Sequence, residues 1–147
     1  MHASSLPNVL SSPEVQAFAA GFPILILHLI VTFGLLAGAA TIYAFMTPWR
    51  EVALIRQGNS AAALAFASVI VSLAIPLSVS LAVANSVRDI ALWGMATVFI
   101  QLLAFRVVDF LLMGLPQRIE KNEISAAVVL AGAKLATALI LAAALTG

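Results

Sequence analysis

The chain has 147 residues, of which 63% are hydrophobic and 9% are charged, and its formal net charge is +1 at pH 7. A soluble domain carries about 25% charged residues, so this composition excludes an ordinary soluble fold and predicts an integral membrane protein. The near-neutral charge gives no indication of a nucleic-acid partner. With no cysteine and only two histidines, the sequence predicts no disulfide, no metal site and no bound cofactor.

Residues 1–16 contain serine, proline and asparagine and are expected to form a short non-spanning arm. A single transmembrane domain, 17–147, is predicted to follow. It contains four apolar stretches, each as long as the roughly 20 residues that a helix needs to cross a bilayer. Because backbone groups in lipid must bond within their own segment, the predicted fold is all-α and polytopic. The expected spans are 17–45, 60–86, 90–112 and 124–145.

Basic residues are distributed unevenly between the connecting loops. Arg50 and Arg56 follow the first span and Arg118 and Lys121 follow the third, whereas the intervening loop contains only Arg88. Because cytoplasmic loops are enriched in lysine and arginine, the sequence predicts a multi-pass protein of the bacterial inner membrane with both termini outside the cytoplasm.

A repeat of 64 residues is indicated within the chain. Each of the second and fourth spans follows a charged loop that contains an asparagine. Two repeated helical hairpins of the same orientation would be related by an axis along the membrane normal. The recurring positions are Ile55, Ala62, Ala63, Ala67 and Ala74, matched by Ile119, Ala126, Ala127, Ala131 and Ala138.

The loop after the first span begins with Thr47 and Pro48, and proline disfavours a helical residue before it. Trp49 suits the membrane interface, Gly58 suits a turn, and either Asn59 or Ser60 suits the N-cap of the second helix. Most of these residues are explained by the construction of a helical hairpin, and a functional loop is the alternative. In the second loop Glu123 takes the place of Asn59.

One face of the second span carries four small or helix-weakening residues. At intervals of four they form a single stripe, for which close helix packing is the preferred interpretation and a hydrated path is the alternative. The stripe comprises Ser68, Ser72, Pro76 and Ser80.

Ionisable residues inside a membrane are costly unless they are paired or hydrated, so they are the strongest functional indication in this chain. Arg106 and Asp109 are spaced for an ion pair within one helix. His28, one turn before Thr32 in the first span, is expected to be hydrogen-bonded rather than to carry protons.

Lys134 lies about 15 Å into the fourth span at 1.5 Å per residue. It is nearly opposite the small face formed by Gly132 and Ala136. If that face packs within the subunit, Lys134 points toward lipid, and a second subunit, a lipid head group or a water-filled cavity would have to accommodate it. We therefore expect a homo-oligomer, with Gln101 and Asp109 as candidate partners of Lys134.

The stretch "TPWREVALIRQGNSAAALAFASVIVSLAIPL" resembles the signature of the YjfL-like family of small bacterial inner-membrane proteins, a domain of unknown function. The resemblance covers about residues 25–145. It implies four helices in two repeated pairs and an inner-membrane location, and it implies no activity. The matching positions are Thr47, Pro48, Trp49, Ile55, Gly58, Asn59, Ala61–Ala63, Ile75, Pro76 and Leu77, then Trp93, Gln101, Phe105, Asp109, Ile119 and Glu120.

The carboxylates Glu51, Glu120 and Glu123 have no histidine near them in the sequence, and no catalytic set is recognised. The sequence therefore predicts a non-enzymatic, oligomeric membrane protein that forms a small conduit for ions or solutes. The alternative is a membrane anchor or scaffold that recruits a cytoplasmic protein in envelope stress handling.

Overall fold

The computed structural model describes residues 12–47 and 50–147, and this part of the chain is helical without strands. Four long helices each meet the length and hydropathy required to cross a membrane. These are α1 (Pro13–Met46), α3 (Ser60–Val83), α4 (Val87–Leu111) and α6 (Ile124–Thr146). The predicted all-α, four-span fold is thus confirmed.

The helix boundaries differ from the predicted ones where serine side chains act as N-caps. α1 begins inside the predicted arm because Ser12 Oγ accepts a hydrogen bond from the backbone N–H of Val15. α4 begins three residues earlier than expected because Ser86 Oγ accepts from the N–H of Asp89. Arg88 and Asp89, expected in a loop, therefore lie in the first turn of α4.

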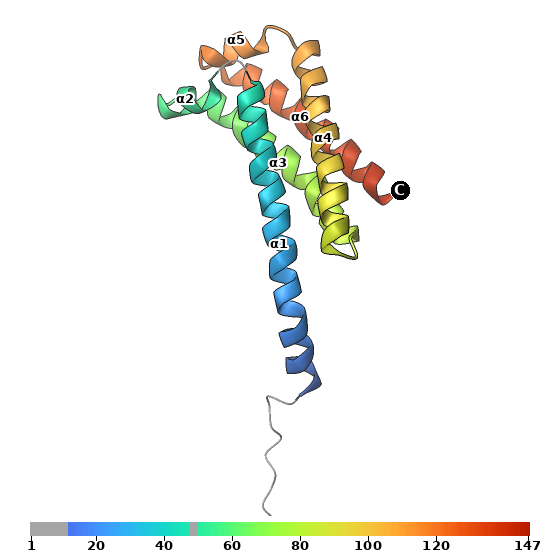
Figure 1. Cartoon of the computed structure of the whole chain (residues 1–147). Helices are drawn as coiled ribbons and strands as arrows, with labels where there is room; N and C mark the ends of the chain where they lie inside the picture. The colour runs from blue at the N-terminus through green and yellow to red at the C-terminus, as the bar shows by residue number, and fades with distance from the viewer. Residues whose placement is uncertain (1–11, 48–49) are drawn as a thin grey trace, which may run out of the picture.

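Two short helices were not predicted: α2 (Glu51–Arg56) and α5 (Leu115–Glu120) replace the expected polar loops. They lie together at one end of the bundle, and the turn between α3 and α4 lies at the other (Figure 1). The four basic residues of the two predicted cytoplasmic loops are all at the α2/α5 end.

The turns that lead into α3 and α6 make the same backbone hydrogen bonds. Gly58 N–H donates to Ile55 O at 3.0 Å, and Asn122 N–H donates to Ile119 O at 2.9 Å. Gly58 has φ +85° and Asn122 has φ +63°, a left-handed conformation that glycine and asparagine tolerate best. Matched turns 64 residues apart are consistent with the predicted repeat, which itself stays a prediction.

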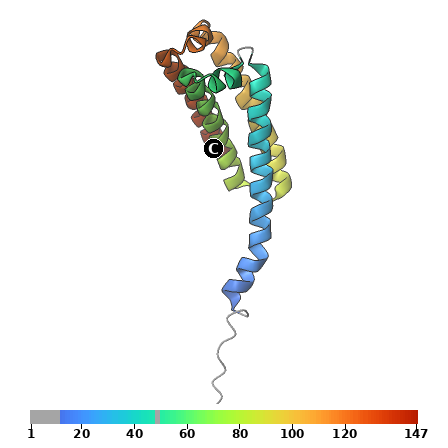
Figure 2. The same ribbon diagram turned by 90° about the vertical axis from the view of Figure 1, so that its left-hand side faces the viewer.

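α3 and α6 form the most extensive helix pair and lie side by side on one side of the bundle, with α1 and α4 on the other (Figure 2). Alanines at the start of both helices, including Ala62 and Ala126, are buried in their interface and allow the backbones to approach closely. Asn59 and Asn122 tie the two helix starts together. Asn59 Nδ2 donates to the carbonyls of Ile119 and Glu120, and Asn122 Oδ1 accepts from the N–H of Ala61.

α1 packs against α4 and α3 only along its C-terminal half. Its 34 residues exceed the 23 to 25 of the other long helices, and its N-terminal part extends beyond the α3–α4 turn (Figures 1 and 2). Large apolar side chains on this part, such as Phe18 and Phe22, are exposed.

Candidate functional site

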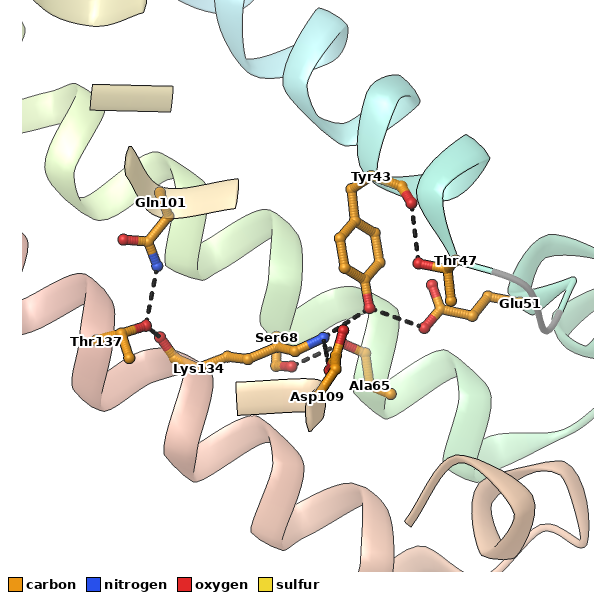
Figure 3. Close-up of polar contacts among 9 residues, drawn as sticks. All are labelled: Tyr43, Thr47, Glu51, Ala65, Ser68, Gln101, Asp109, Lys134 and Thr137. Carbon is orange, nitrogen blue, oxygen red and sulfur yellow. Dashed lines mark hydrogen bonds and ion pairs between the residues drawn. The ribbon is translucent and has the colours of Figure 1, made fainter. Parts of the chain in front are cut away.

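Lys134 lies at the centre of a polar cluster in which three long helices meet. Its side chain is completely buried. Nζ donates a hydrogen bond to Tyr43 Oη at 2.7 Å and forms an ion pair with Asp109 Oδ1 at 3.0 Å (Figure 3). The ammonium also lies 4.5 Å from the ring centroid of Tyr43 and 5.2 Å from that of Phe105, within the range of cation–π attraction.

The direction of the Lys134 side chain explains how these residues meet. Helical side chains lean toward the N-terminus of their helix, and α6 begins at the α2/α5 end (Figure 1). The lysine stem therefore carries Nζ toward that end, where Tyr43 and Asp109 lie within a turn of the ends of α1 and α4.

The expected orientation of α6 is wrong. Gly132 and Ala136 are exposed, whereas Lys134 faces the interior of its own subunit. The packed face of α6 is formed by Ala127, Leu130 and Ala138, which are buried against the rest of the bundle. Lys134 therefore needs neither a second subunit nor a lipid head group to satisfy its charge.

The expected ion pair within α4 is also replaced by another. Asp109 pairs with Lys134 on α6. Arg106 is exposed on the outer surface of α4, and among residues 12–47 and 50–147 it has no hydrogen-bond or ion-pair partner. The two residues project in different directions, because three helical positions differ by about 60° around the axis.

Glu51 extends the cluster to the α2/α5 end, and sequence reasoning did not assign it a role. Its side chain is buried, and Oε1 accepts a hydrogen bond from Tyr43 Oη at 3.2 Å. Burial raises the pKa of the Glu51 carboxyl to about 7, although the charge of Lys134 and the Tyr43 hydrogen bond oppose the rise. Glu51 is thus poised to exchange a proton near neutral pH.

Gln101 connects to the other side of Lys134 through Thr137. Gln101 Nε2 donates to Thr137 Oγ1 at 3.2 Å, and Thr137 Oγ1 donates to the backbone carbonyl of Lys134 at 2.7 Å. Gln101 was expected as a direct partner of Lys134, and the structure places it one residue further along this chain of contacts (Figure 3).

The stripe on α3 is buried, and part of it has no hydrogen-bond partner. Ser68 donates to Ala65 O at 2.6 Å, while Pro76 makes apolar contacts in the interior. Several polar atoms further along the bundle are buried without a partner among the described residues: Ser72 Oγ, Ser80 Oγ, Thr97 Oγ1 and Gln101 Oε1. Burying a hydroxyl without a hydrogen bond costs about 1–3 kcal/mol, and bridging water is the usual remedy.

A cavity lies at each end of this series of polar residues. At the α3–α4 turn, Ser80, Asp89 and Trp93 line a cavity of 390 Å³. At the α2/α5 end, Glu51 lines a groove of 720 Å³ together with Arg56 and other residues of α1 and α2. The series therefore runs between two openings at opposite ends of the bundle.

The remaining predicted site residues take structural positions. Thr47 Oγ1 donates to Tyr43 O at 2.9 Å, and Glu123 pairs with Arg118, which lowers the Glu123 pKa to about 2. His28 is half-buried, and its backbone carbonyl accepts from Thr32 Oγ1. Pro48 and Trp49 lie outside the described residues. Within the described ranges, no three His, Asp or Glu side chains are grouped to hold a metal ion.

Comparison with known proteins identifies the family. Residues 17–145 match the family described as Domain of Unknown Function (DUF350). The chain is 35% identical over 105 residues to the UPF0719 inner membrane protein YjfL of Escherichia coli strain K12, a match that covers 71% of this chain and 80% of that protein. The same protein from Escherichia coli O157:H7 matches to the same extent. No solved structure matches significantly. The chain is therefore a multi-pass inner-membrane protein that belongs to the DUF350 family.

Proposed function

We propose that this protein is a non-enzymatic conduit for a small ion, and that the ion is a proton. The observation that carries the proposal is the buried polar series between the two cavities, which we call the polar column. On the α3–α4 side it contains Ser80, Thr97 and Ser72 with unpartnered oxygen atoms. It continues through Gln101 and Thr137 to the backbone carbonyl of Lys134. The side chain of Lys134 then carries Nζ to Tyr43, which bonds Glu51 at the groove.

The chemistry of the column fits proton relay. Hydroxyl, amide and carboxyl groups in a membrane interior commonly mark a proton path, with water joining groups that lack a direct partner. Most side chains of the column, including Ser72, Ser80, Thr97 and Gln101, are buried and packed, which favours a proton over a hydrated metal ion as the permeant species. A proton needs only the exchange of hydrogen bonds.

Glu51 and Lys134 form the end of the column at which a proton would be released to solution. Tyr43 Oη accepts from Lys134 and donates to Glu51, so its hydroxyl joins the paired charges to the groove. With the Glu51 pKa at about 7, a proton taken from the column is released to a solution near neutral pH. The basic residues at this end favour the cytoplasm as that solution, and on this basis we propose that both termini lie outside the cytoplasm.

Proton flux into liposomes tests the proposal. Purified protein is reconstituted with a pH-sensitive dye inside the vesicles, and a potassium–valinomycin potential drives uptake. We expect acidification with the wild-type protein and a loss of at least tenfold with Ser72→Ala or Glu51→Gln. Ser78→Ala is the matched control, because Ser78 is exposed and its hydroxyl donates to Ile75 O within the same helix.

Two results overturn the proposal. The first is a wild-type flux equal to that of empty vesicles. The second is an equal flux through Ser72→Ala and wild-type protein, because the Ser72 hydroxyl is one of the buried groups that the proposed path uses.

An oligomer is supported by α1 rather than by Lys134. The N-terminal part of α1 extends beyond the bundle with its apolar side chains uncovered. Packing of these parts from several copies buries them, and we propose a homo-oligomer on this basis. Phe18→Ser with Phe22→Ser is expected to reduce the oligomer mass in detergent, whereas Phe110→Ser, exposed on α4, leaves it unchanged. Unchanged mass in both variants contradicts assembly through α1.

A scaffold role is the second candidate. The groove beside α2 is lined by Arg50, Val52 and Arg56, with the exposed ring of Phe45 at its edge, and such a groove suits an acidic, partly apolar segment of a cytoplasmic protein. A photo-crosslinker at Val52 in living cells is expected to yield one discrete adduct that Arg56→Glu removes. An absence of flux together with this adduct favours the scaffold over the conduit.

A further inference from the structure

A third cavity, apart from the two at the ends of the polar column, lies between α1 and α4 on the membrane-facing side of the bundle. It has a volume of 580 Å³ and an almost entirely apolar lining. We call it the α1–α4 groove. Its principal lining residues are Gly34, Gly38, Ile42 and Met46 from α1, and Phe99 and Arg106 from α4.

The two glycines of α1 keep this groove open. A Cβ atom built on Gly34 or Gly38 would meet no atom within 4 Å, so neither glycine brings α1 close to another helix of the subunit. The sequence pattern of two glycines four residues apart usually indicates helix packing. Here the space that their missing side chains leave is open to the membrane.

The length of the groove matches one leaflet of a bilayer. From Gly34 to Met46 the helix rises about 18 Å at 1.5 Å per residue, and half of a bilayer's hydrocarbon core is about 15 Å thick. Met46 is the last residue of α1 at the α2/α5 end. The groove therefore runs from the membrane interior to the head-group level of the leaflet at that end.

Arg106 is the single charged residue in the lining of the groove. It lies five residues before the end of α4, about 7.5 Å below it, so its long side chain can reach the head-group level. Asp109, one turn away, is already paired with Lys134. The guanidinium of Arg106 thus lacks an anion among the described residues, and a planar guanidinium binds phosphate oxygens in pairs.

A second copy of the chain does not supply that anion. The sequence contains six carboxylates. Asp109 is paired with Lys134 and Glu51 is buried, while Glu120 and Glu123 are in and beyond α5, and Glu14 and Asp89 lie toward the opposite end. Glu120, exposed on α5, is the one left at the head-group level, and it lies outside the lining of the groove, whereas a phospholipid seated in the groove carries its phosphate at that level beside Arg106.

We propose that the α1–α4 groove binds an anionic phospholipid, with one acyl chain along the glycine-lined floor and the phosphate on Arg106. The apolar lining buries the acyl chain of the lipid, and the Arg106 guanidinium gives the groove its preference for an anionic head group. The site is independent of the proton path, because the groove and the polar column share no residue.

Native mass spectrometry of the purified protein tests the site. Delipidated protein in detergent is titrated with phosphatidylglycerol and, separately, with phosphatidylcholine. We expect the wild-type protein to bind phosphatidylglycerol more tightly. One cation near the head group is worth about 1 kcal/mol, so Arg106→Gln is expected to weaken phosphatidylglycerol binding about fivefold and to remove the preference.

Two further variants separate the tail from the head group. Gly38→Leu fills the floor of the groove and is expected to weaken the binding of both lipids. Gly132→Leu is the matched control, because Gly132 is an exposed glycine on α6, outside the groove, whose Cβ would also meet no atom. Arg88→Gln, an exposed arginine at the other end, controls for the loss of charge.

Each alternative outcome overturns the proposal. Equal lipid binding by wild-type protein and Arg106→Gln shows that the arginine does not recognise the head group. Loss of oligomer mass in Gly38→Leu with unchanged lipid binding shows that a second copy occupies the groove. An unfolding temperature of each variant within a few degrees of the wild type verifies that the comparison concerns folded protein.

Discussion

The ammonium of Lys134 and the carboxylate of Asp109 lie 3.0 Å apart between α6 and α4, and the lysine is completely buried. The ion pair joins α6 to α4. Tyr43 of α1 accepts a hydrogen bond from the same ammonium, so three helices meet at Lys134. Stability and the proposed proton path therefore depend on one arrangement of side chains.

Removal of one member of this pair is expected to destabilise the fold strongly. Lys134→Met leaves Asp109 without its partner, and loss of one partner of a buried pair typically costs 3–5 kcal/mol. The double variant Lys134→Met with Asp109→Leu removes both charges and is expected to recover most of this loss. Thermal unfolding in detergent measures the effect, and equal destabilisation of the single and double variants would contradict a direct pair.

The pH dependence of stability is expected to reflect Glu51. Its pKa is about 7 in the folded protein against an ordinary value of 4.5, so between these values the folded state binds more protons than the unfolded state. The free energy of unfolding therefore falls as pH rises through this window, by on the order of 3 kcal/mol, and levels off above pH 7.

Glu51→Gln cannot ionise and is expected to flatten that part of the curve. Unfolding temperatures measured from pH 4.5 to 8 provide the comparison. Glu120→Gln, an exposed carboxylate on α5, is the control that retains the wild-type curve. A wild-type curve without a slope in this window would mean that Glu51 titrates as an ordinary carboxyl.

Two substitutions at Asn122, in the turn before α6, separate the cost of backbone strain from the loss of a hydrogen bond. Asn122→Gly keeps the left-handed conformation and loses only the bond to Ala61 N–H, about 1 kcal/mol. Asn122→Ala loses the same bond and adds 1–2 kcal/mol of strain at positive φ. We expect unfolding temperatures in the order wild type, Asn122→Gly, Asn122→Ala, and the reverse order of the two variants would exclude strain as the cause.

Gly94 is expected to be intolerant of a side chain. A Cβ at this position would lie 2.5 Å from Leu35 Cδ1 and 3.5 Å from Leu77 Cδ2, so Gly94→Ala must displace the Leu35 side chain. Overpacking of this kind typically costs 1–3 kcal/mol. Leu35→Ala in the same chain opens the space, and the double variant is expected to be less destabilised than the sum of the two single changes. Additive losses would indicate that the contact is absent.

The spans could be predicted from the sequence because apolar length is a local property. The prediction of α6 orientation failed because periodicity shows which residues share a face but not which face packs inward. Lys134 meets Tyr43 across 91 positions of the sequence, and no local pattern records such a contact. Tyr43 is the single tyrosine of the chain and lies within a span, and this was the available indication of its role.

The short helices were missed for a related reason. α2 and α5 are six residues each, shorter than a helix that is stable alone, and they are held by contacts with α3 and α6. Glu51 is buried because α2 packs against α3 and the Glu51 carboxyl reaches Tyr43 of α1, whereas its position in a charged loop sequence indicated solvent exposure.

Asn59 and Asn122, before α3 and α6, each form hydrogen bonds to the backbone near the start of the other helix, and this has a consequence for biosynthesis. The N–H of Ala61 is bonded by a side chain that the ribosome adds 61 residues later, and the Asn59 amide bonds carbonyls that are equally late. The first hairpin therefore enters the membrane with part of the start of α3 unsatisfied. We therefore expect a nascent chain truncated before α5 to remain a substrate for quality-control proteases, because the partners of these groups are missing from it.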